Sequence, residues 1–215
     1  MAELLAQKYL IKVCGVTTED DAELVVAAGA NAVGVILARS SRRVSHERAR
    51  SVLHAVPASV VRVGVLRQTS DAELRRTLSE LELDAVQVHG PLPASTHELA
   101  RDHGVALIRA VGVNELGPLG TLEAAEAYLL DGPHPGSGRE QEWTDIHAVD
   151  WPGALIVAGG LNGQNVAGVL ASVGAWGCDA ASGTESQPGR KDASRVASFV
   201  RAARDYFESR EEQRG

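Results

Sequence analysis

A cysteine and an aspartate, each at the end of an apolar run, are the residues best suited to acid–base chemistry. Cys14 follows the run at 9–13, and Asp131 follows the run at 127–130. In a protein of alternating strands and helices, the carboxyl ends of the strands open onto the active face. Taken alone, Cys14 would fit a buried structural role better than a catalytic one. Together, a thiol and a carboxyl facing each other across one opening would form an acid–base pair.

Two later strand ends carry glycines that predict an anion site. Gly159 and Gly160 follow the seventh predicted strand, while Ser182 and Gly183 follow the eighth. Glycines let backbone N–H groups approach an anion, and a short helical turn would aim its positive end at the same point. Glycines alone would indicate tight turns. Because the loops after strands seven and eight are the recurring phosphate site of a (β/α)8 barrel, we favour phosphate.

Three other segments place polar side chains near the same face. The loop at 39–45 is rich in arginine, whose fork can grip a carboxylate, although most surface arginines do nothing so specific. Gln87 and His89 have the same strand parity, so both would point into the barrel or its mouth, in a structural or a functional role. The glycine-rich segment at 132–139 could close over a ligand or be an ordinary loop.

The elements that would position these residues alternate regularly along the chain. Short β-branched runs, each followed by an amphipathic stretch, predict βα units around a parallel sheet. The expected strands are 9–13, 32–37, 60–65, 85–89, 106–111, 127–130, 154–158 and 177–180. The expected helices are 19–28, 46–54, 71–81, 95–102, 165–172 and 193–209, with two short ones at 121–126 and 144–149.

Eight such units predict a single-domain (β/α)8 TIM barrel over residues 1–215. Ser45 and Ser70 provide helix N-caps, and Gly29 and Gly104 follow helices where a left-handed cap suits glycine. An open doubly wound sheet is the alternative. The first helix lacks the Gly-x-Gly-x-x-Gly opening of the dinucleotide-binding version of that fold.

Composition excludes several classes of protein. The net charge of −7 argues against a general nucleic-acid or anionic-membrane surface. Two cysteines are too few for a disulfide framework and have no metal-ligand spacing. The first eight residues lack the pattern of a signal peptide, and no apolar run approaches the roughly 20 residues of a membrane span. We expect a cytoplasmic protein, a monomer or homodimer, with a frayed charged tail at 209–215.

Six segments, spread in order over nearly the whole chain, form a pattern known from one enzyme family. The most specific are Lys-Val-Cys-Gly-Val-Thr at 12–17 and Ser-Gly-Thr-Glu-Ser-Gln-Pro-Gly-Arg-Lys-Asp at 182–192. The others lie at 40–45, 84–90, 129–131 and 158–161. Together they closely resemble the phosphoribosylanthranilate isomerases of tryptophan biosynthesis.

The resemblance implies a cofactor-free Amadori rearrangement, without a metal, of N-(5-phosphoribosyl)anthranilate to 1-(2-carboxyphenylamino)-1-deoxyribulose 5-phosphate. An acid must protonate the ribose ring oxygen, and a base must remove the proton at C2. By similarity Cys14 is the base and Asp131 the acid. We expect the positive charge of Lys12 to favour the thiolate of Cys14. Burial beside a phosphorylated ligand is expected to raise the pKa of Asp131.

The same resemblance implies a set of residues that bind the substrate. Arg42 corresponds to the clamp for the anthranilate carboxylate, and Asp179 to a partner of a ribose hydroxyl. The residues that correspond to the phosphate cradle are Gly159, Gly160, Ser182 and Gly183. Lys12, Gln87 and His89 complete the expected substrate-binding set.

Several positions depart from the family pattern. Arg67 and Gln68 stand where an apolar residue and an asparagine are usual, and Ala181 replaces a serine. Ser41 replaces a common proline, and the segment after strand six has Arg139, Gln141 and Glu142 for lysine, phenylalanine and aspartate. These changes cluster around the ligand and leave the acid–base pair in place. Two alternatives therefore stay open: a diverged relative acting on another aminated or phosphorylated substrate, and a non-catalytic binding protein on the same barrel.

Overall fold

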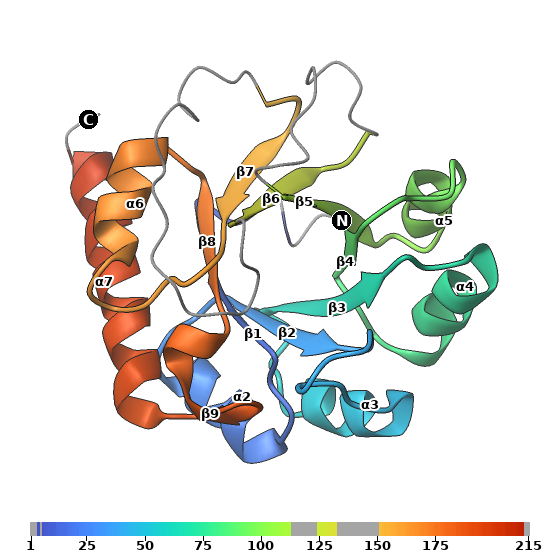
Figure 1. Ribbon diagram of the computed structural model, residues 1–215, viewed down its shortest axis with the longest axis horizontal. Coiled ribbons are helices and arrows are strands. Elements are labelled where there is room, and N and C mark those ends of the chain that lie inside the picture. Colours follow the sequence, from blue (N-terminus) through green and yellow to red (C-terminus); the bar gives the residue numbers. More distant parts are fainter. Residues whose placement is uncertain (1–3, 5, 113–123, 133–150, 213–215) are drawn as a thin grey trace.

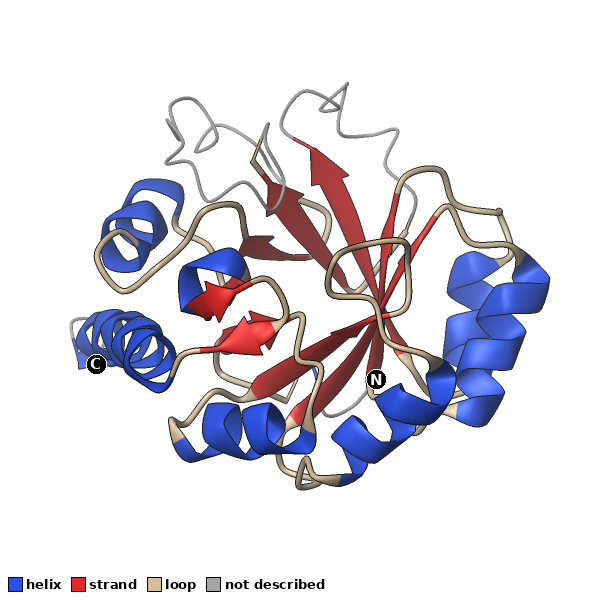
Figure 2. Ribbon diagram, turned by 60° about the horizontal axis from the view of Figure 1, so that its bottom comes forward, coloured by secondary structure: helices blue, strands red, loops and turns tan. Residues whose placement is uncertain are grey.

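Eight parallel strands close into a barrel, with helices on its outer surface (Figures 1 and 2). The computed structural model describes residues 4, 6–112, 124–132 and 151–212. Each strand pairs with its neighbour in sequence, and β8 pairs with β1 to complete the circle. The strands are β1 (Leu10–Cys14), β2 (Ala32–Ile36), β3 (Val61–Arg67), β4 (Ala85–His89), β5 (Ala106–Gly112), β6 (Ala127–Asp131), β7 (Ala154–Val157) and β8 (Gly177–Ala180). The predicted (β/α)8 barrel is confirmed.

Strand parity divides the core into two layers. Side chains of one parity, such as Val63, Val65 and Leu129, fill the barrel interior. Those of the other parity, such as Val86 and Leu107, pack beneath the surrounding helices. A parallel strand that is buried on both faces needs apolar residues along its whole length. The strands therefore stand out in the sequence as continuous apolar runs.

The helices follow the strands as the sequence indicates. Ser45 accepts a hydrogen bond from the backbone N–H of Arg48, and Ser70 accepts one from that of Glu73, so both predicted N-caps are confirmed. Gly29 and Gly104 adopt φ values of 89° and 71°, the left-handed conformation expected after a helix. The helices are α2 (Glu19–Ala27), α3 (His46–His54), α4 (Asp71–Glu80), α5 (Thr96–Asp102), α6 (Val166–Val173) and α7 (Ala193–Glu212).

Three sequence-based expectations need comment. A frayed tail was expected at 209–215; α7 continues through Glu212, the Ser209 hydroxyl donates a hydrogen bond to the carbonyl of Tyr206, and residues 213–215 lie outside the described residues. Residues 124–126 of the short helix expected at 121–126 are not helical. The rest of that helix, the one expected at 144–149 and all of the 132–139 segment except Gly132 lie outside the described residues. None of the described helices is long and apolar enough to cross a membrane.

The short helical turn expected after β8 is present, but the hairpin that follows it was not predicted. A 3-10 turn, η4 (Ser182–Thr184), leads into an antiparallel hairpin of β9 (Glu185–Gln187) and β10 (Arg190–Lys191). The Thr17 hydroxyl, in the loop after β1, donates a 2.6 Å hydrogen bond to the carbonyl of Gly189. The hairpin is therefore fixed against the loop after β1, at the barrel end where the strands finish.

The closing seam between β1 and β8 predicts a contrast between two glycine substitutions. A Cβ at Gly177 would lie 2.8 Å from Leu10 Cβ and 3.0 Å from Leu10 O, whereas one at Gly168, in α6, would meet nothing within 4 Å. Gly177→Ala should therefore lower the free energy of unfolding by about 1–3 kcal/mol through overpacking. Gly168→Ala should raise it by about 0.5–1 kcal/mol. Urea denaturation measures both changes, and equal effects of the two variants would contradict the seam's tight packing.

Candidate active site

The carboxyl ends of the strands surround a cavity of about 240 Å³. Strand parity directs Cys14 from β1, Asp131 from β6 and the pair Gln87 and His89 from β4 into the same space. Of the other residues singled out from the sequence, Arg42, Gly159, Gly160, Asp179 and Ser182 also line this cavity. Lys12 lies beneath it, fully buried, and Gly183 lines an adjoining cavity.

A buried ion pair crosses the β1–β8 seam at the floor of the cavity. Lys12 and Asp179 are partners in the strand register, and Lys12 Nζ lies 3.0 Å from Asp179 Oδ1. Burial alone would lower the pKa of Lys12, but Asp179 and Cys14 more than offset this effect and raise it. A Cβ at Gly34 would lie 3.0 Å from both Cys14 Sγ and Lys12 Cε. The glycine therefore makes room for the thiol and the lysine to lie side by side.

The thiol of Cys14 does not have the lowered pKa that the sequence suggested. Burial raises the pKa of Cys14 above its usual value, and although Lys12 opposes the shift as expected, it does not overcome it. The carboxylate of Asp179 adds to the increase. Cys14 is accordingly protonated in the resting protein, and Lys12 is placed to stabilise the thiolate when it forms.

The carboxyl of Asp131 has the raised pKa expected of a general acid. Burial, and then the negative charge of Asp179, raise its pKa to about 6, against the opposing effects of the Gly132 backbone N–H and Lys12. Because the protein alone produces this shift, no ligand is required for it. Gly159 allows the arrangement, since its φ is 97° and a Cβ there would lie 2.7 Å from Gly132 N and 3.2 Å from Asp131 Oδ1.

Gln87 and His89 form a polar pair on the wall of the cavity. Gln87 Nε2 lies 2.8 Å from His89 Nε2, an arrangement in which the amide donates to a neutral imidazole. Burial, assisted by Lys12, Arg67 and Arg109, lowers the pKa of His89 to about 4. His89 is therefore neutral near pH 7. Among the described residues, the buried oxygen of the Gln87 amide has no hydrogen-bond partner, so it is available to a donor in the cavity.

Arg42 is held by a carboxylate that sequence reasoning missed. Its Nε lies 2.8 Å from Glu185 Oε1 and its Nη2 lies 2.7 Å from Glu185 Oε2, a two-pronged interaction. Lys191 donates to Glu185 Oε1 at 3.2 Å and to the carbonyl of Cys14 at 2.7 Å. Glu185 and Lys191 thus link the loop after β2 to the end of β1. In the sequence, the one indication that Glu185 and Lys191 belong to the site is that both lie in the segment 182–192, which resembles the family pattern.

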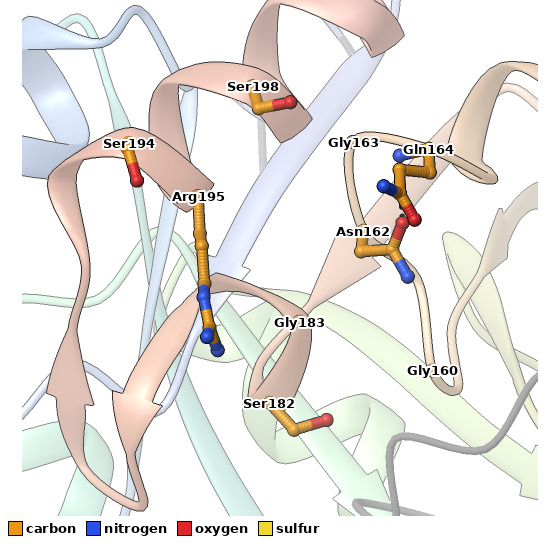
Figure 3. Close-up of a pocket in the computed structure, with 9 residues that line it drawn as sticks. All are labelled: Gly160, Asn162, Gly163, Gln164, Ser182, Gly183, Ser194, Arg195 and Ser198. Atoms are coloured by element: carbon orange, nitrogen blue, oxygen red, sulfur yellow. Dashed lines mark hydrogen bonds between the residues drawn. The ribbon is translucent and has the colours of Figure 1, made fainter.

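The predicted phosphate cradle lies where β7 and β8 end. A Cβ at Gly183 would overlap the carbonyl oxygen of Leu161, so η4 and the loop after β7 can approach this closely because Gly183 has no side chain. An adjoining polar cavity of about 580 Å³ lies between this loop, η4 and the start of α7. Figure 3 shows the residues that line it. Gly160 and Ser182 line both cavities. The cradle therefore forms the wall that the two cavities share.

The departures from the family pattern fall largely at the rim. Arg67 and Ala181 line the central cavity, and Gln68 has a φ of 47°. Arg139, Gln141 and Glu142 lie outside the described residues. Within the described part of the chain, no group of three or more His, Cys, Asp or Glu side chains is arranged to hold a metal ion.

Comparison with known proteins identifies the family. The model of the N-(5'-phosphoribosyl)anthranilate (PRA) isomerase family matches residues 11–202. The chain belongs to this family. The N-(5'-phosphoribosyl)anthranilate isomerase of Rubrobacter xylanophilus is 37% identical over 202 residues, which cover 90% of the chain and 98% of the relative. That of Acidithiobacillus ferrooxidans is 38% identical over 203 residues, covering 90% and 97%.

Solved structures of PRA isomerases have the same fold. The phosphoribosyl anthranilate isomerase of Thermus thermophilus superimposes with a TM-score of 0.83 at 34% identity, covering 91% of this chain and 98% of that one. A second phosphoribosyl anthranilate isomerase structure, solved in complex with reduced 1-(o-carboxyphenylamino)-1-deoxyribulose 5-phosphate, has a TM-score of 0.76 at 31% identity. The match covers 92% of this chain and 99% of that one. The resemblance inferred from the six sequence segments is confirmed.

The buried network predicts a large loss of stability when Lys191 is replaced. Lys191→Met removes the donor that joins Cys14 O to Glu185 and leaves buried acceptors without it, so the free energy of unfolding should fall by about 2–4 kcal/mol. Arg76→Gln is the control, because the Arg76–Glu80 pair is exposed and its loss should have no measurable effect. Urea denaturation at pH 7 compares the variants. A Lys191→Met protein as stable as wild type would contradict the role of this network.

The pKa of Asp131 predicts a pH-dependent gain in stability for Asp131→Asn. The folded-state pKa of about 6 exceeds the unfolded value of about 3.9, so the folded protein loses stability as pH rises through this window. The neutral amide avoids that loss. We expect Asp131→Asn to be more stable than wild type by about 1–3 kcal/mol at pH 7.5, with the difference shrinking by pH 4.5. A difference independent of pH, measured by urea denaturation, would contradict the raised pKa.

Proposed function

We propose that this chain catalyses the isomerisation of N-(5-phosphoribosyl)anthranilate to 1-(2-carboxyphenylamino)-1-deoxyribulose 5-phosphate, without a cofactor, in tryptophan biosynthesis. The observation that carries the proposal is that a thiol and a carboxyl of raised pKa, Cys14 and Asp131, line one cavity beside a glycine-rich cradle. Membership of the PRA isomerase family supports the same reaction.

The cavity can accommodate the three parts of this substrate in order. The phosphate would bind the backbone of the cradle at the ends of β7 and β8. Two to four strands away around the barrel, apolar side chains including Ile36 of β2 and Val65 of β3 would receive the aromatic ring. The ribose would then lie between Cys14 and Asp131.

The two central groups would move the protons of the reaction. Neutral Asp131 donates its proton to the ribose ring oxygen, and the C1–O bond breaks as the anilino nitrogen forms a protonated imine. The thiolate of Cys14 then removes the proton at C2, and the electron pair left behind forms an enol-amine that tautomerises to the ketone. A thiolate paired with a protonated carboxyl is a minor state here, because the pKa of Cys14 lies above that of Asp131. Lys12 stabilises that state through its charge beside the sulfur.

The remaining side chains would orient the substrate. Asp179, held by Lys12, is placed to accept a hydrogen bond from a ribose hydroxyl, and the orphan oxygen of Gln87 can accept another. His89 is neutral and would line the cavity with an uncharged side chain. Arg42 would contribute its Nη1 group, the part of its fork not bonded to Glu185, to the anthranilate carboxylate.

We also propose a cytoplasmic location, since a reducing compartment keeps the Cys14 thiol free for proton transfer. Both cysteines are unpaired in the structure. Sedimentation of the purified chain distinguishes the monomer and homodimer that the sequence allows.

The proposal predicts that Cys14→Ser and Asp131→Asn each lower kcat about 10²–10⁴-fold, the contribution of one acid or base. Turnover is followed as loss of fluorescence from freshly made phosphoribosylanthranilate. Cys178→Ala is the matched control, because it removes a buried thiol that packs on the outer side of the barrel wall. It should keep activity near that of wild type.

Two outcomes would overturn the assignment. Undiminished turnover in both the Cys14 and Asp131 variants would show that other groups move the protons. A folded wild-type chain that neither turns over phosphoribosylanthranilate nor rescues a tryptophan auxotroph lacking this step would favour the diverged relative or the binding protein.

A further inference from the structure

Arg42, which the resemblance assigns to the substrate carboxylate, already binds a carboxylate of the protein. Two of the three nitrogens of its guanidinium, Nε and Nη2, are bonded to Glu185. Glu185 is itself almost fully buried and held by Lys191, so the pair is a fixed part of the wall. These bonds use one edge of the guanidinium and leave only the other edge, an N–H of Nη1 and the second N–H of Nη2, for a further carboxylate.

Arg67 provides a second guanidinium at the rim of the same cavity, and this group is not bonded to any described residue. It is the last residue of β3 and shares the inward parity of Val63 and Val65, so it faces the mouth of the cavity that it lines. Its register partner on β4 is His89. Within the described part of the chain its side chain has no hydrogen bond or ion pair, whereas Arg62, outward-facing on the same strand, is bound to Asp84 and Glu82. An exposed, unpaired guanidinium at a cavity rim is available to an anionic ligand.

The surface between Arg67 and the catalytic pair suits a flat aromatic acid. Ile36 and Val65 line the cavity from β2 and β3, and Ala38 lines it from the loop after β2. Around the closed barrel, β2 and β3 are two to four strands away from β7 and β8, whose ends carry the glycine cradle. A substrate anchored by its phosphate on the cradle would therefore direct its aryl group against this apolar wall, with its ortho carboxylate toward the arginine rim.

We propose that Arg67 binds the carboxylate of the N-aryl group, together with the Nη1 group of Arg42, and so makes this chain selective for substrates that carry that carboxylate. The inference rests on the proposed function and adds to it a specificity-determining residue. This contact strengthens binding in ground and transition states alike, so its loss should affect kcat/KM and Kd more than kcat.

The test compares two ligands that differ in one group. One is reduced 1-(o-carboxyphenylamino)-1-deoxyribulose 5-phosphate, and the other is its analogue made from aniline, which lacks the carboxylate. Calorimetric titration gives Kd for each ligand with wild type, Arg67→Gln, Arg67→Lys and Arg75→Gln. Arg75 is an exposed arginine on α4 that lines neither cavity of the site, so its variant matches the change in charge. Circular dichroism confirms that each variant is folded.

We expect Arg67→Gln to raise the Kd of the carboxylated ligand about tenfold and that of the analogue less than twofold. Arg67→Lys, which keeps the charge without the fork, should fall between wild type and Arg67→Gln, and Arg75→Gln should bind both ligands as wild type does.

Arg39 also lines the cavity, so Arg39→Gln is titrated in the same way. Three outcomes would overturn the inference: equal weakening of both ligands by Arg67→Gln, an equal effect of Arg75→Gln, or a selective loss in Arg39→Gln but not in Arg67→Gln. In each case wild type still binds the carboxylated ligand and the proposed function stands. If wild type fails to bind that ligand, the proposed function itself fails.

Discussion

The ion pair between Lys12 and Asp179 is the constraint on which the site depends. An ammonium that is fully buried must keep a charged partner, because an unpaired buried charge costs several kcal/mol. The pair therefore fixes β1 against β8 where the barrel closes. It also affects the electrostatics above it: after burial, Asp179 is the next largest cause of the raised pKa of Asp131, and Lys12 lies beside the sulfur of Cys14. One interaction thus serves closure of the fold and the proton chemistry.

A second buried lysine ties the loops to this frame. Lys191 bonds the carbonyl of Cys14 and the carboxylate of Glu185, which holds Arg42. The binding arginine is therefore oriented before any ligand arrives. Such preorganisation reduces the side-chain entropy lost on binding. The bonds to Glu185 also occupy one edge of the Arg42 guanidinium, and an additional arginine at position 67 would supply further donors.

Much of the fold and the site could be predicted from the sequence, because strand periodicity is local and parity fixes where a side chain points. The eight strands and the convergence of Cys14 with Asp131 follow from that pattern. The β9–β10 hairpin could not be predicted, since its residues have no apolar repeat and are held by contacts such as Thr17 to Gly189. The pairing of Arg42 with Glu185 joins residues 143 positions apart, and the net pKa direction of Cys14 depends on the depth of its burial.

The burial of Cys14 also affects how readily its thiol is oxidised or alkylated. Peroxides and alkylating agents attack the thiolate and need access to it. Cys14 is 5% exposed, and its raised pKa keeps the sulfur protonated between turnovers. The residue that the proposed mechanism uses as a base is thus kept in its unreactive form, so we expect this thiol to outlast more accessible thiols under oxidation.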